Sequence, residues 1–201
     1  GLEDQVIDED TSLTFEINGS DVDGDDLTYS AINGGATIEV NGSTLTLTPP
    51  ANDNGNGEVI VTVSDGQLET TESFTLIVNP VNDAPTVDDV TGTTSEDTDF
   101  VLELNATDID GDELTFLASV AANGSASVDG STLTVTPDAD YNGTLEVTVT
   151  ASDGQGSGSG TLTLDVTPVN DAPVISGLED QVIDEDTSLT FEINGSDVDG
   201  D

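Results

Sequence analysis

Two five-residue motifs combine three aspartates with one glycine. They are Asp21-Val22-Asp23-Gly24-Asp25 and Asp108-Ile109-Asp110-Gly111-Asp112. A turn of this kind gathers carboxylate oxygens, the ligands that Ca²⁺ prefers, and its glycine adopts backbone angles that a side chain resists. The loop spacing and the closing Glu of an EF-hand are absent, so one motif alone fits a calcium loop and a solvated turn equally well.

The charge of the chain makes bound cations a general requirement. Its 201 residues include 43 Asp and Glu but no Lys, Arg or His, which gives a formal net charge of -43. Two like charges about 4 Å apart repel by roughly 1 kcal/mol even in water, so we expect the folded chain to need cations from outside. The same balance argues against binding nucleic acid or anionic membranes, whose phosphates are contacted mainly by Lys and Arg.

The missing residue types also exclude whole classes of chemistry. Without Cys there are no disulfides and no thiolate zinc sites, so bound ions remain as the way to stabilise a domain with a small hydrophobic core. Without His, Cys, Lys or Arg, the usual general base, the thiolate nucleophile and the cationic oxyanion clamp are all absent. Paired carboxylates would suit a glycosidase, but such an enzyme needs aromatic platforms, and the chain has only five Phe and two Tyr. We therefore predict that the chain is not an enzyme.

The motifs belong to a repeating array. Residues 1–25 return letter for letter as residues 177–201, a spacing of 176 residues, and the two aspartate motifs lie 87 residues apart. Fixed-period similarity marks tandem units that contact their neighbours. We predict a domain A over residues 1–82, a related domain B over residues 83–170, and the start of another A-type domain over residues 171–201.

The sequence of each domain predicts a set of short strands. Apolar residues alternate with polar ones, which indicates β-strands and argues against a disordered acidic chain. In domain A the alternating positions are Leu13, Phe15 and Ile17; Ile38 and Val40; Leu45 and Leu47; Val59, Val61 and Val63; and Phe74, Leu76 and Val78. Asn41-Gly42 and Asp129-Gly130 suit two-residue type I′ hairpin turns. About seven strands and no helical periodicity predict an all-β sandwich.

Short proline-flanked linkers join the domains. Pro80 and Pro85 flank one Asn-Asp-Ala-containing linker, and Pro168 and Pro173 flank the other, which makes both stiffer than a Gly/Ser tether. Asn-Gly-Ser occurs at 18–20, 41–43, 123–125 and 194–196. This triplet fits the N-glycosylation pattern, but Asn-Gly is also a preferred turn, and we favour the turn.

Together, the Asn-Asp-Ala-Pro linkers and the Asp-x-Asp-Gly-Asp loops resemble the cadherin-like tandem repeats of long bacterial surface proteins and adhesins. The resemblance covers the whole chain and implies tandem cadherin-like or immunoglobulin-like sandwiches joined end to end, with several Ca²⁺ ions at each junction. It assigns Glu9, Asn82, Asp83, Asp108, Asp110 and Asp153 to the A/B junction, and Glu96, Asn170, Asp171, Asp197 and Asp199 to the B/A junction. It assigns Asp21, Asp23 and Asp65 to a junction before Gly1.

Three departures from that family leave details open. The linker is one residue shorter than in cadherins. The late acidic pair of the family resembles Asp138 and Asp140 in domain B, whereas Pro50 and Asn52 stand there in domain A. The A/B junction would therefore hold fewer calcium ions, or hold them less tightly, unless Asp53 compensates. The extra carboxylates Asp25 and Asp112 would shape the turn or add a ligand.

The resulting functional prediction is a structural one. Calcium would lock consecutive domains of an extracellular, cell-surface stalk or filament, and the partners would be neighbouring repeats of the same protein. The alternatives are an adhesin module that binds glycans or another cell surface, and a fibre in which separate chains associate, for example through an edge strand. The chain has no segment apolar enough for membrane insertion and opens without a signal peptide, but both ends look cut from something longer, so this says nothing about location.

Overall fold

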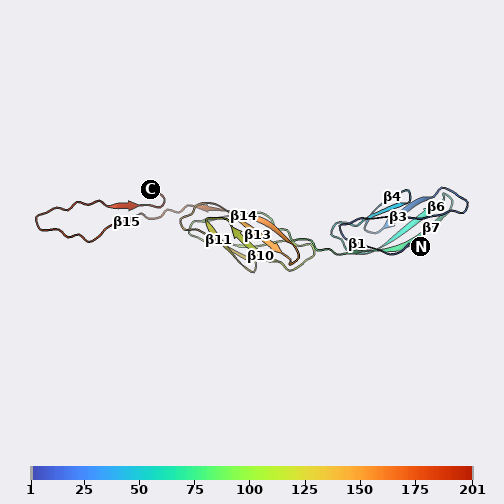
Figure 1. Cartoon of the computed structure of the whole chain (residues 1–201), viewed down its shortest axis with the longest axis horizontal. Coiled ribbons are helices and arrows are strands. Elements are labelled where there is room, and N and C mark those ends of the chain that lie inside the picture. The colour runs from blue at the N-terminus through green and yellow to red at the C-terminus, as the bar shows by residue number, and fades with distance from the viewer. Residues whose placement is uncertain (1, 201) are drawn as a thin grey trace. The chain divides into compact units, whose positions relative to one another are not determined.

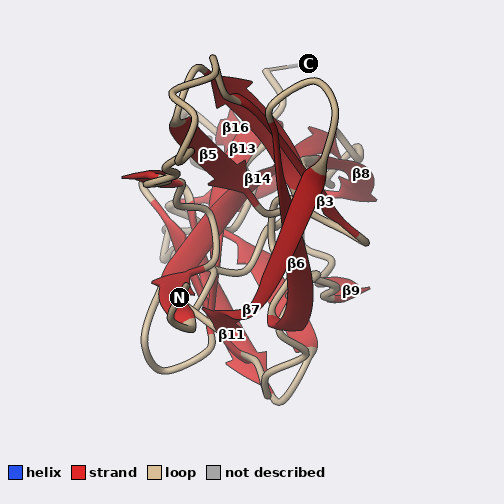
Figure 2. Cartoon of the chain, turned by 90° about the vertical axis from the view of Figure 1, so that its right-hand side faces the viewer, coloured by secondary structure: helices blue, strands red, loops and turns tan. Residues whose placement is uncertain are grey.

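The computed structural model describes residues 2–200, and its regular structure consists of strands and turns, with no helix among these residues (Figure 2). It forms two compact units, Gly1–Asp83 and Ala84–Asp201, and Figure 1 labels some of the strands of each. The all-β prediction is confirmed. The finer domain boundaries at residues 82 and 170 stay predictions. The described residues contain no helix that is long and apolar enough to cross a membrane.

The first unit is a sandwich of two sheets. The larger sheet has the order β1-β7-β6-β3 and the smaller one the order β2-β5-β4. The strands are β1 (Gln5–Asp8), β2 (Leu13–Glu16), β3 (Thr28–Asn33), β4 (Thr37–Asn41), β5 (Thr44–Thr48), β6 (Gly55–Ser64) and β7 (Glu69–Asn79). β1 runs parallel to β7, whereas the other pairs are antiparallel. The chain thus switches sheets between β1 and β2, and Glu9 lies at this crossing.

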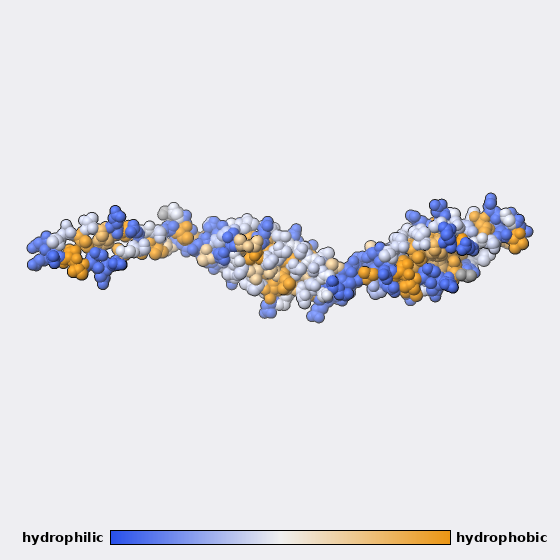
Figure 3. Space-filling view, viewed as in Figure 1, coloured by the Kyte–Doolittle hydropathy of each residue, from blue (hydrophilic) through white to orange (hydrophobic). Residues whose placement is uncertain are grey.

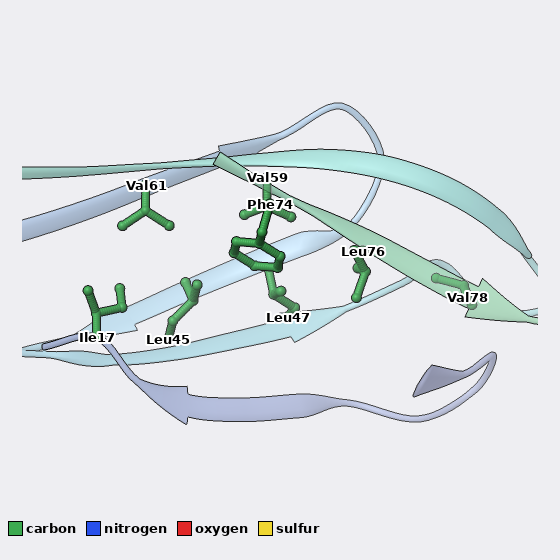
Figure 4. Close-up of a cluster of buried hydrophobic side chains, with 8 residues drawn as sticks. All are labelled: Ile17, Leu45, Leu47, Val59, Val61, Phe74, Leu76 and Val78. Carbon is green, nitrogen blue, oxygen red and sulfur yellow. The ribbon is translucent and has the colours of Figure 1, made fainter. Parts of the chain in front are cut away.

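The core of the first unit follows from the alternation of apolar residues. Every second residue of β5 points inward, so Leu45 and Leu47 are fully buried while their threonine neighbours are not. Phe74 of β7 packs edge-to-face on Phe15 of β2, with 5.7 Å between ring centroids. Figure 4 shows the buried cluster between the two sheets: Ile17, Leu45, Leu47, Val59, Val61, Phe74, Leu76 and Val78.

The second unit repeats this sandwich. Its sheets have the orders β10-β13-β14-β8 and β11-β12-β9, and β8 runs parallel to β14 as β1 does to β7. The strands are β8 (Val90–Ser95), β9 (Phe100–Glu103), β10 (Thr115–Val120), β11 (Gly124–Asp129), β12 (Thr132–Pro137), β13 (Gly143–Ser152) and β14 (Ser157–Thr167). After this sandwich, β15 (Val174–Ser176) pairs antiparallel with β16 (Asn194–Ser196).

The hairpin turns lie one residue later than the sequence suggested. Asn41 pairs with Thr44 and Asp129 with Thr132, so the two-residue loops are Gly42-Ser43 and Gly130-Ser131. The two glycines have φ values of 60° and 62°. A glycine at the first loop position fits a type II′ turn, so the type I′ prediction was wrong. The turn interpretation of Asn-Gly-Ser also fails at residues 194–196, which form β16.

Candidate metal centres

A buried glutamate stands at the same place in each sandwich. Glu9 is 2% exposed and Glu96 is 3% exposed. Each follows the first strand of its domain, and its backbone N–H donates to the carbonyl at the end of β7 or β14. An ionised group without partners would be costly at such burial, so its environment has to supply donors or cations.

The linker and a loop asparagine supply those donors. In the first unit, Val81 N–H donates to Glu9 Oε1 at 2.6 Å, and Asn54 Nδ2 donates to Oε2 at 3.4 Å. In the second unit, Val169 and Asn142 make the same two contacts to Glu96. Each glutamate therefore ties the start of its domain to the linker that leaves it.

The residue after each buried glutamate was not predicted as part of the site. Asp10 and Asp97 both have positive φ, 60° and 58°. Asp10 Oδ1 accepts the N–H of Asn52 at 3.0 Å, and Asp97 Oδ1 accepts the N–H of Asp140 at 3.2 Å. The recurrence of Glu-Asp at 9–10, 96–97 and 185–186 is the sequence signal that could have identified them.

In the second unit, four carboxylates converge on that of Asp171. Glu96, Asp171 and Asp199 offer oxygens within 4.8 Å of one another, and so do Asp97, Asp140 and Asp171. Asp171 N–H donates to Asp199 Oδ2 at 2.7 Å, whereas the buried Oδ2 of Asp171 has no hydrogen-bond partner. We name these five residues the Asp171 cluster.

The electrostatics of the Asp171 cluster are unfavourable without a cation. Burial raises the pKa of Asp171, and the carboxylates of Asp140, Asp199, Asp97 and Glu96 raise it further. Both causes disfavour the charged form of this carboxylate. A hard cation with oxygen ligands would reverse both, because it supplies positive charge and a partner for the buried oxygen. The donor set and the orphan oxygen therefore fit Ca²⁺.

Other residues expected at this junction have supporting positions. Asp197 Oδ1 accepts the N–H of Asp199 at 2.9 Å and so shapes the loop that presents Asp199. Asn170 Nδ2 donates to the carbonyl of Asp171 at 2.8 Å. Asp138 accepts the N–H of Tyr141 through its backbone carbonyl, and its side chain belongs to none of the acidic groups of the described residues.

The first unit contains the corresponding half-site. Glu9 and Asp83 offer oxygens within 4.8 Å of each other, and Asn82 Nδ2 donates to the carbonyl of Asp83 at 3.1 Å, as Asn170 does to Asp171. Asn52 has φ 55° and Asp140 has φ 57°, so the two equivalent backbones match. Asp53 is exposed and joins no acidic group of the described residues.

The two aspartate motifs form matching turns. Asp108 Oδ1 accepts the N–H groups of Gly111 at 3.0 Å and Asp112 at 3.3 Å, while its buried Oδ2 has no hydrogen-bond partner. Asp108, Asp110 and Asp112 offer oxygens within 4.8 Å of one another. Asp112 is thus both a turn residue and a member of an acidic group.

In the first unit, the equivalent turn is closed by three hydrogen bonds to Asp21. Asp21 Oδ1 accepts the N–H groups of Asp23 at 2.8 Å, Gly24 at 2.9 Å and Asp25 at 3.3 Å. Within the described part of the chain, these aspartates belong to no acidic group of three.

Asp65 and Asp153 each hold a turn at the end of a long strand. Asp65 Oδ1 accepts the N–H groups of Gln67 and Leu68, each at 2.7 Å. The N–H of Leu68, followed by that of Gln67, lowers the pKa of Asp65. Asp153 Oδ1 accepts the equivalent N–H groups of Gln155 and Gly156. Neither aspartate joins an acidic group of three within residues 2–200.

Comparisons with known proteins found matches to these sandwiches. The family profile described as "Bacterial Ig domain" matches residues 2–78 and 82–167. Chitinase A of Pseudoalteromonas piscicida is 34% identical over 116 residues, which is 55% of this chain and 14% of that protein. The chain thus spans about a seventh of this curated relative.

Similar solved structures include the EC1-2 domains of human protocadherin-24, with 16% identity, a TM-score of 0.47, and coverage of 76% of this chain and 87% of that one. They also include an endo-fucoidan hydrolase of glycoside hydrolase family 107, with 21% identity, a TM-score of 0.36, and coverage of 84% and 27%.

Proposed function

Since this chain belongs to the bacterial Ig domain family, we propose that it is a non-catalytic, calcium-binding structural repeat of an extracellular stalk or filament. The observation that carries the proposal is the buried, unpartnered Oδ2 of Asp171, which lies among four other carboxylates. A chain with a net charge of -43 and no cationic side chain has no internal group that can neutralise this cluster. A divalent ion is the simplest counter-charge.

The Asp171 cluster draws on three parts of the second unit. Glu96, Asp97 and Asp140 belong to the sandwich, Asp171 to the linker, and Asp199 to the loop that follows β16. Ca²⁺ takes six to eight oxygen ligands, so one or two ions would use most of these carboxylates together with backbone carbonyls and water. When bound, the ion supplies the positive charge that turns repelling carboxylates into common ligands. The linker and the following loop would then be fixed to the sandwich.

The first junction is proposed from sequence equivalence. Glu9, Asn82 and Asp83 correspond to Glu96, Asn170 and Asp171, and their local hydrogen bonds match. We expect Asp108 and Asp110 to supply the other half of this site, with Asp153 as a turn residue. Asp21, Asp23, Asp25 and Asp65 would do the same for a preceding repeat.

Calcium titration of the whole 201-residue chain tests the proposal. Extracellular calcium modules bind with dissociation constants of about 0.1–1 mM, so calorimetry should detect binding in that range. Asp171→Asn should abolish or strongly weaken one class of sites. Asp165→Asn is the matched control, because it removes the same charge from an exposed position of β14 outside the acidic groups of the described residues. Equal calcium binding by both variants would contradict the proposal.

A glycan-binding module is the second candidate. It is favoured by the 34% identity to part of a protein named chitinase A. The aromatic residues of the two sandwiches oppose it, because Phe15, Phe74, Phe100, Phe116, Tyr29 and Tyr141 all pack in or against the cores. A pull-down on chitin and a glycan array, both with calcium present, decide this point. Retention on any glycan at micromolar protein would favour the second candidate.

A further inference from the structure

The first sandwich has a hollow at the end where β6 begins and β7 ends. Its volume is about 670 Å³, and all of its lining residues lie between residues 32 and 78. This size is typical of pockets that hold a small ligand or a side chain of a partner. We name it the β6 hollow. Its apolar lining includes Ile32, Ala36, Pro49, Ile60, Leu76 and Val78.

The second sandwich fills the same place with two of its own side chains. A spacing of 88 residues aligns Asp53 with Tyr141 and Gly57 with Leu145. The strand pairing supports this alignment, because the registers of β6 with β7 and of β13 with β14 also differ by 88 residues. Leu145 belongs to the core of the second unit, and Tyr141 packs against it. Domain A therefore lacks two large side chains that domain B has.

A matched pair of glycines shows that the place of the tyrosine is open in domain A. Gly55 and Gly143 have nearly the same φ, 131° and 134°. A Cβ on Gly143 would lie 3.1 Å from the hydroxyl oxygen of Tyr141, whereas a Cβ on Gly55 would meet no atom of the described residues within 4 Å. The Tyr141 hydroxyl donates to the carbonyl of Thr144 at 3.0 Å, and Asn56, which lines the β6 hollow, is the residue equivalent to Thr144.

The place of the leucine is partly taken by Asn33. A Cβ on Gly57 would lie 3.0 Å from Asn33 Nδ2. This nitrogen donates to the carbonyl of Glu58 at 3.0 Å, and Asn33 Oδ1 accepts the N–H groups of Gly35 and Ala36, each at 2.8 Å. Three hydrogen bonds thus hold Asn33 as a wall of the β6 hollow. The part that stays open is the part that a tyrosine occupies in domain B.

Charge selects the kind of molecule that carries such a ring. Asp53 and Glu58 are exposed lining residues, and the chain has no Lys, Arg or His. A ring next to positive charge is therefore attracted, and an acidic molecule is repelled. Figure 3 shows blue hydrophilic residues beside orange hydrophobic ones on the visible face of both sandwiches. A second copy has no tyrosine to offer, because Tyr29 and Tyr141 both pack against the cores.

We propose that the β6 hollow binds a tyrosine side chain of a basic partner protein, in a segment where Lys or Arg flanks the tyrosine. The ring would lie against the apolar lining, where its burial favours binding. Its hydroxyl would donate to the carbonyl of Asn56, as that of Tyr141 does to Thr144. The flanking cations would pair with the carboxylates of Asp53 and Glu58.

Protein NMR of the whole 201-residue chain with calcium tests the site with two probes. One is 4-methylphenol, the side chain of tyrosine, and the other is the capped peptide acetyl-Lys-Tyr-Lys-amide. Both should shift the amide signals of residues 55–57 saturably and leave those of residues 143–145 unchanged, because Tyr141 fills domain B. The peptide should bind about threefold to tenfold more tightly than 4-methylphenol, since two exposed ion pairs add to the ring.

Three variants separate the ring from the charge. Asp53→Tyr gives domain A the residue of domain B and should abolish the response of residues 55–57 to both probes. Glu39→Tyr is the control, because it places a tyrosine on an exposed position of β4 outside the lining, and it should leave both responses intact. Asp53→Asn should leave the binding of 4-methylphenol unchanged and weaken that of the peptide by about twofold to threefold.

Four results would overturn the proposal. They are the absence of a saturable shift at residues 55–57, an equal shift at residues 143–145, a response that survives Asp53→Tyr, and an equal response to acetyl-Lys-Ala-Lys-amide. The last result would mean that the peptide is held by charge alone. The spectrum of Asp53→Tyr without probes shows whether domain A is folded, and Asp53→Asn tests the charge even if that variant does not fold.

Discussion

The two sandwiches hold their buried glutamates in the same way but surround them with different charge. Glu9 and Glu96 are both almost fully buried, and each accepts from an equivalent linker N–H and an equivalent asparagine. Next to them, however, Asn52 stands in domain A where Asp140 stands in domain B. Their backbones agree within a few degrees of φ, and both donate to the aspartate after the glutamate. The scaffold is thus constant, and the number of carboxylates on it varies.

The largest expected effect follows from removing a buried glutamate. Glu96→Ala should lower calcium affinity at the B/A junction by about a hundredfold, because it deletes the ligand that also positions the linker. It should destabilise domain B by about 1–3 kcal/mol, because the N–H of Val169 loses its part-buried hydrogen-bond acceptor. Calorimetry and thermal unfolding measure the two effects.

The comparison would be broken if Glu9→Ala, made in the other domain, weakened the same sites as Glu96→Ala. We expect Glu9→Ala to leave the Asp171 cluster unchanged, since Glu9 belongs to the first unit.

A reciprocal exchange of one residue should interconvert the two half-sites. Asp140→Asn gives domain B the residue of domain A and should weaken its calcium binding by about tenfold, because ligand charge sets the affinity of such sites. Asn52→Asp should strengthen binding at the other junction by a similar factor. Calorimetric titration of each variant, with Asp165→Asn as the charge-matched control, measures these shifts.

Opposite shifts in the two variants would sharpen the comparison. If both exchanges left the affinities unchanged, the difference between Asn52 and Asp140 would have no functional meaning.

A smaller effect concerns protonation without calcium. In the presence of chelator, the pKa of Asp171 should lie above that of an ordinary aspartate, because burial and the neighbouring carboxylates oppose its charge. Among these carboxylates, Asp140 has the strongest effect. Carbon-detected NMR of its carboxyl group measures this pKa directly. Asp140→Asn should lower it, and an unshifted Asp171 would argue against a convergent cluster.

The pKa shifts of Asp171 and Asp65 imply opposite pH dependences of stability in the presence of chelator. The contribution of Asp171 to stability is present below its unfolded pKa and is lost as the pH rises through its raised folded pKa. The pKa of Asp65 is lowered by backbone N–H groups, so its contribution is present above its unfolded pKa and is lost as the pH falls through its folded pKa. Measuring the stability of Asp171→Asn, Asp65→Asn and the natural chain across a range of pH separates the two contributions.

Much of this architecture could be predicted because the relevant signals are periodic. Alternating apolar residues gave the strands, and Leu45 and Leu47 are as buried as the alternation requires. The resemblance of the Asn-Asp-Ala-Pro linkers and Asp-x-Asp-Gly-Asp loops to cadherin-like repeats brought Glu96, Asp171 and Asp199 into consideration, and the structure brings them together.

The sequence is least informative where three-dimensional pairing decides. Both Asn41-Gly42 and Gly42-Ser43 contain good turn residues, and only the pairing of Asn41 with Thr44 selects the second. Asp138 and Asp140 look equally suitable in sequence, but only Asp140 has the positive φ that accompanies its place beside Asp97. Asp97 itself was overlooked because an acidic residue next to an assigned ligand carries little signal in so acidic a chain.

The most direct test of the central claim is small-angle X-ray scattering of the whole chain, first with calcium and then with excess chelator at equal ionic strength. If calcium locks consecutive domains, the distribution of interatomic distances should be sharp with calcium and should broaden on chelation, and Asp171→Asn should reduce this difference. Identical scattering curves in calcium and chelator, with calcium shown to be bound, would contradict the account.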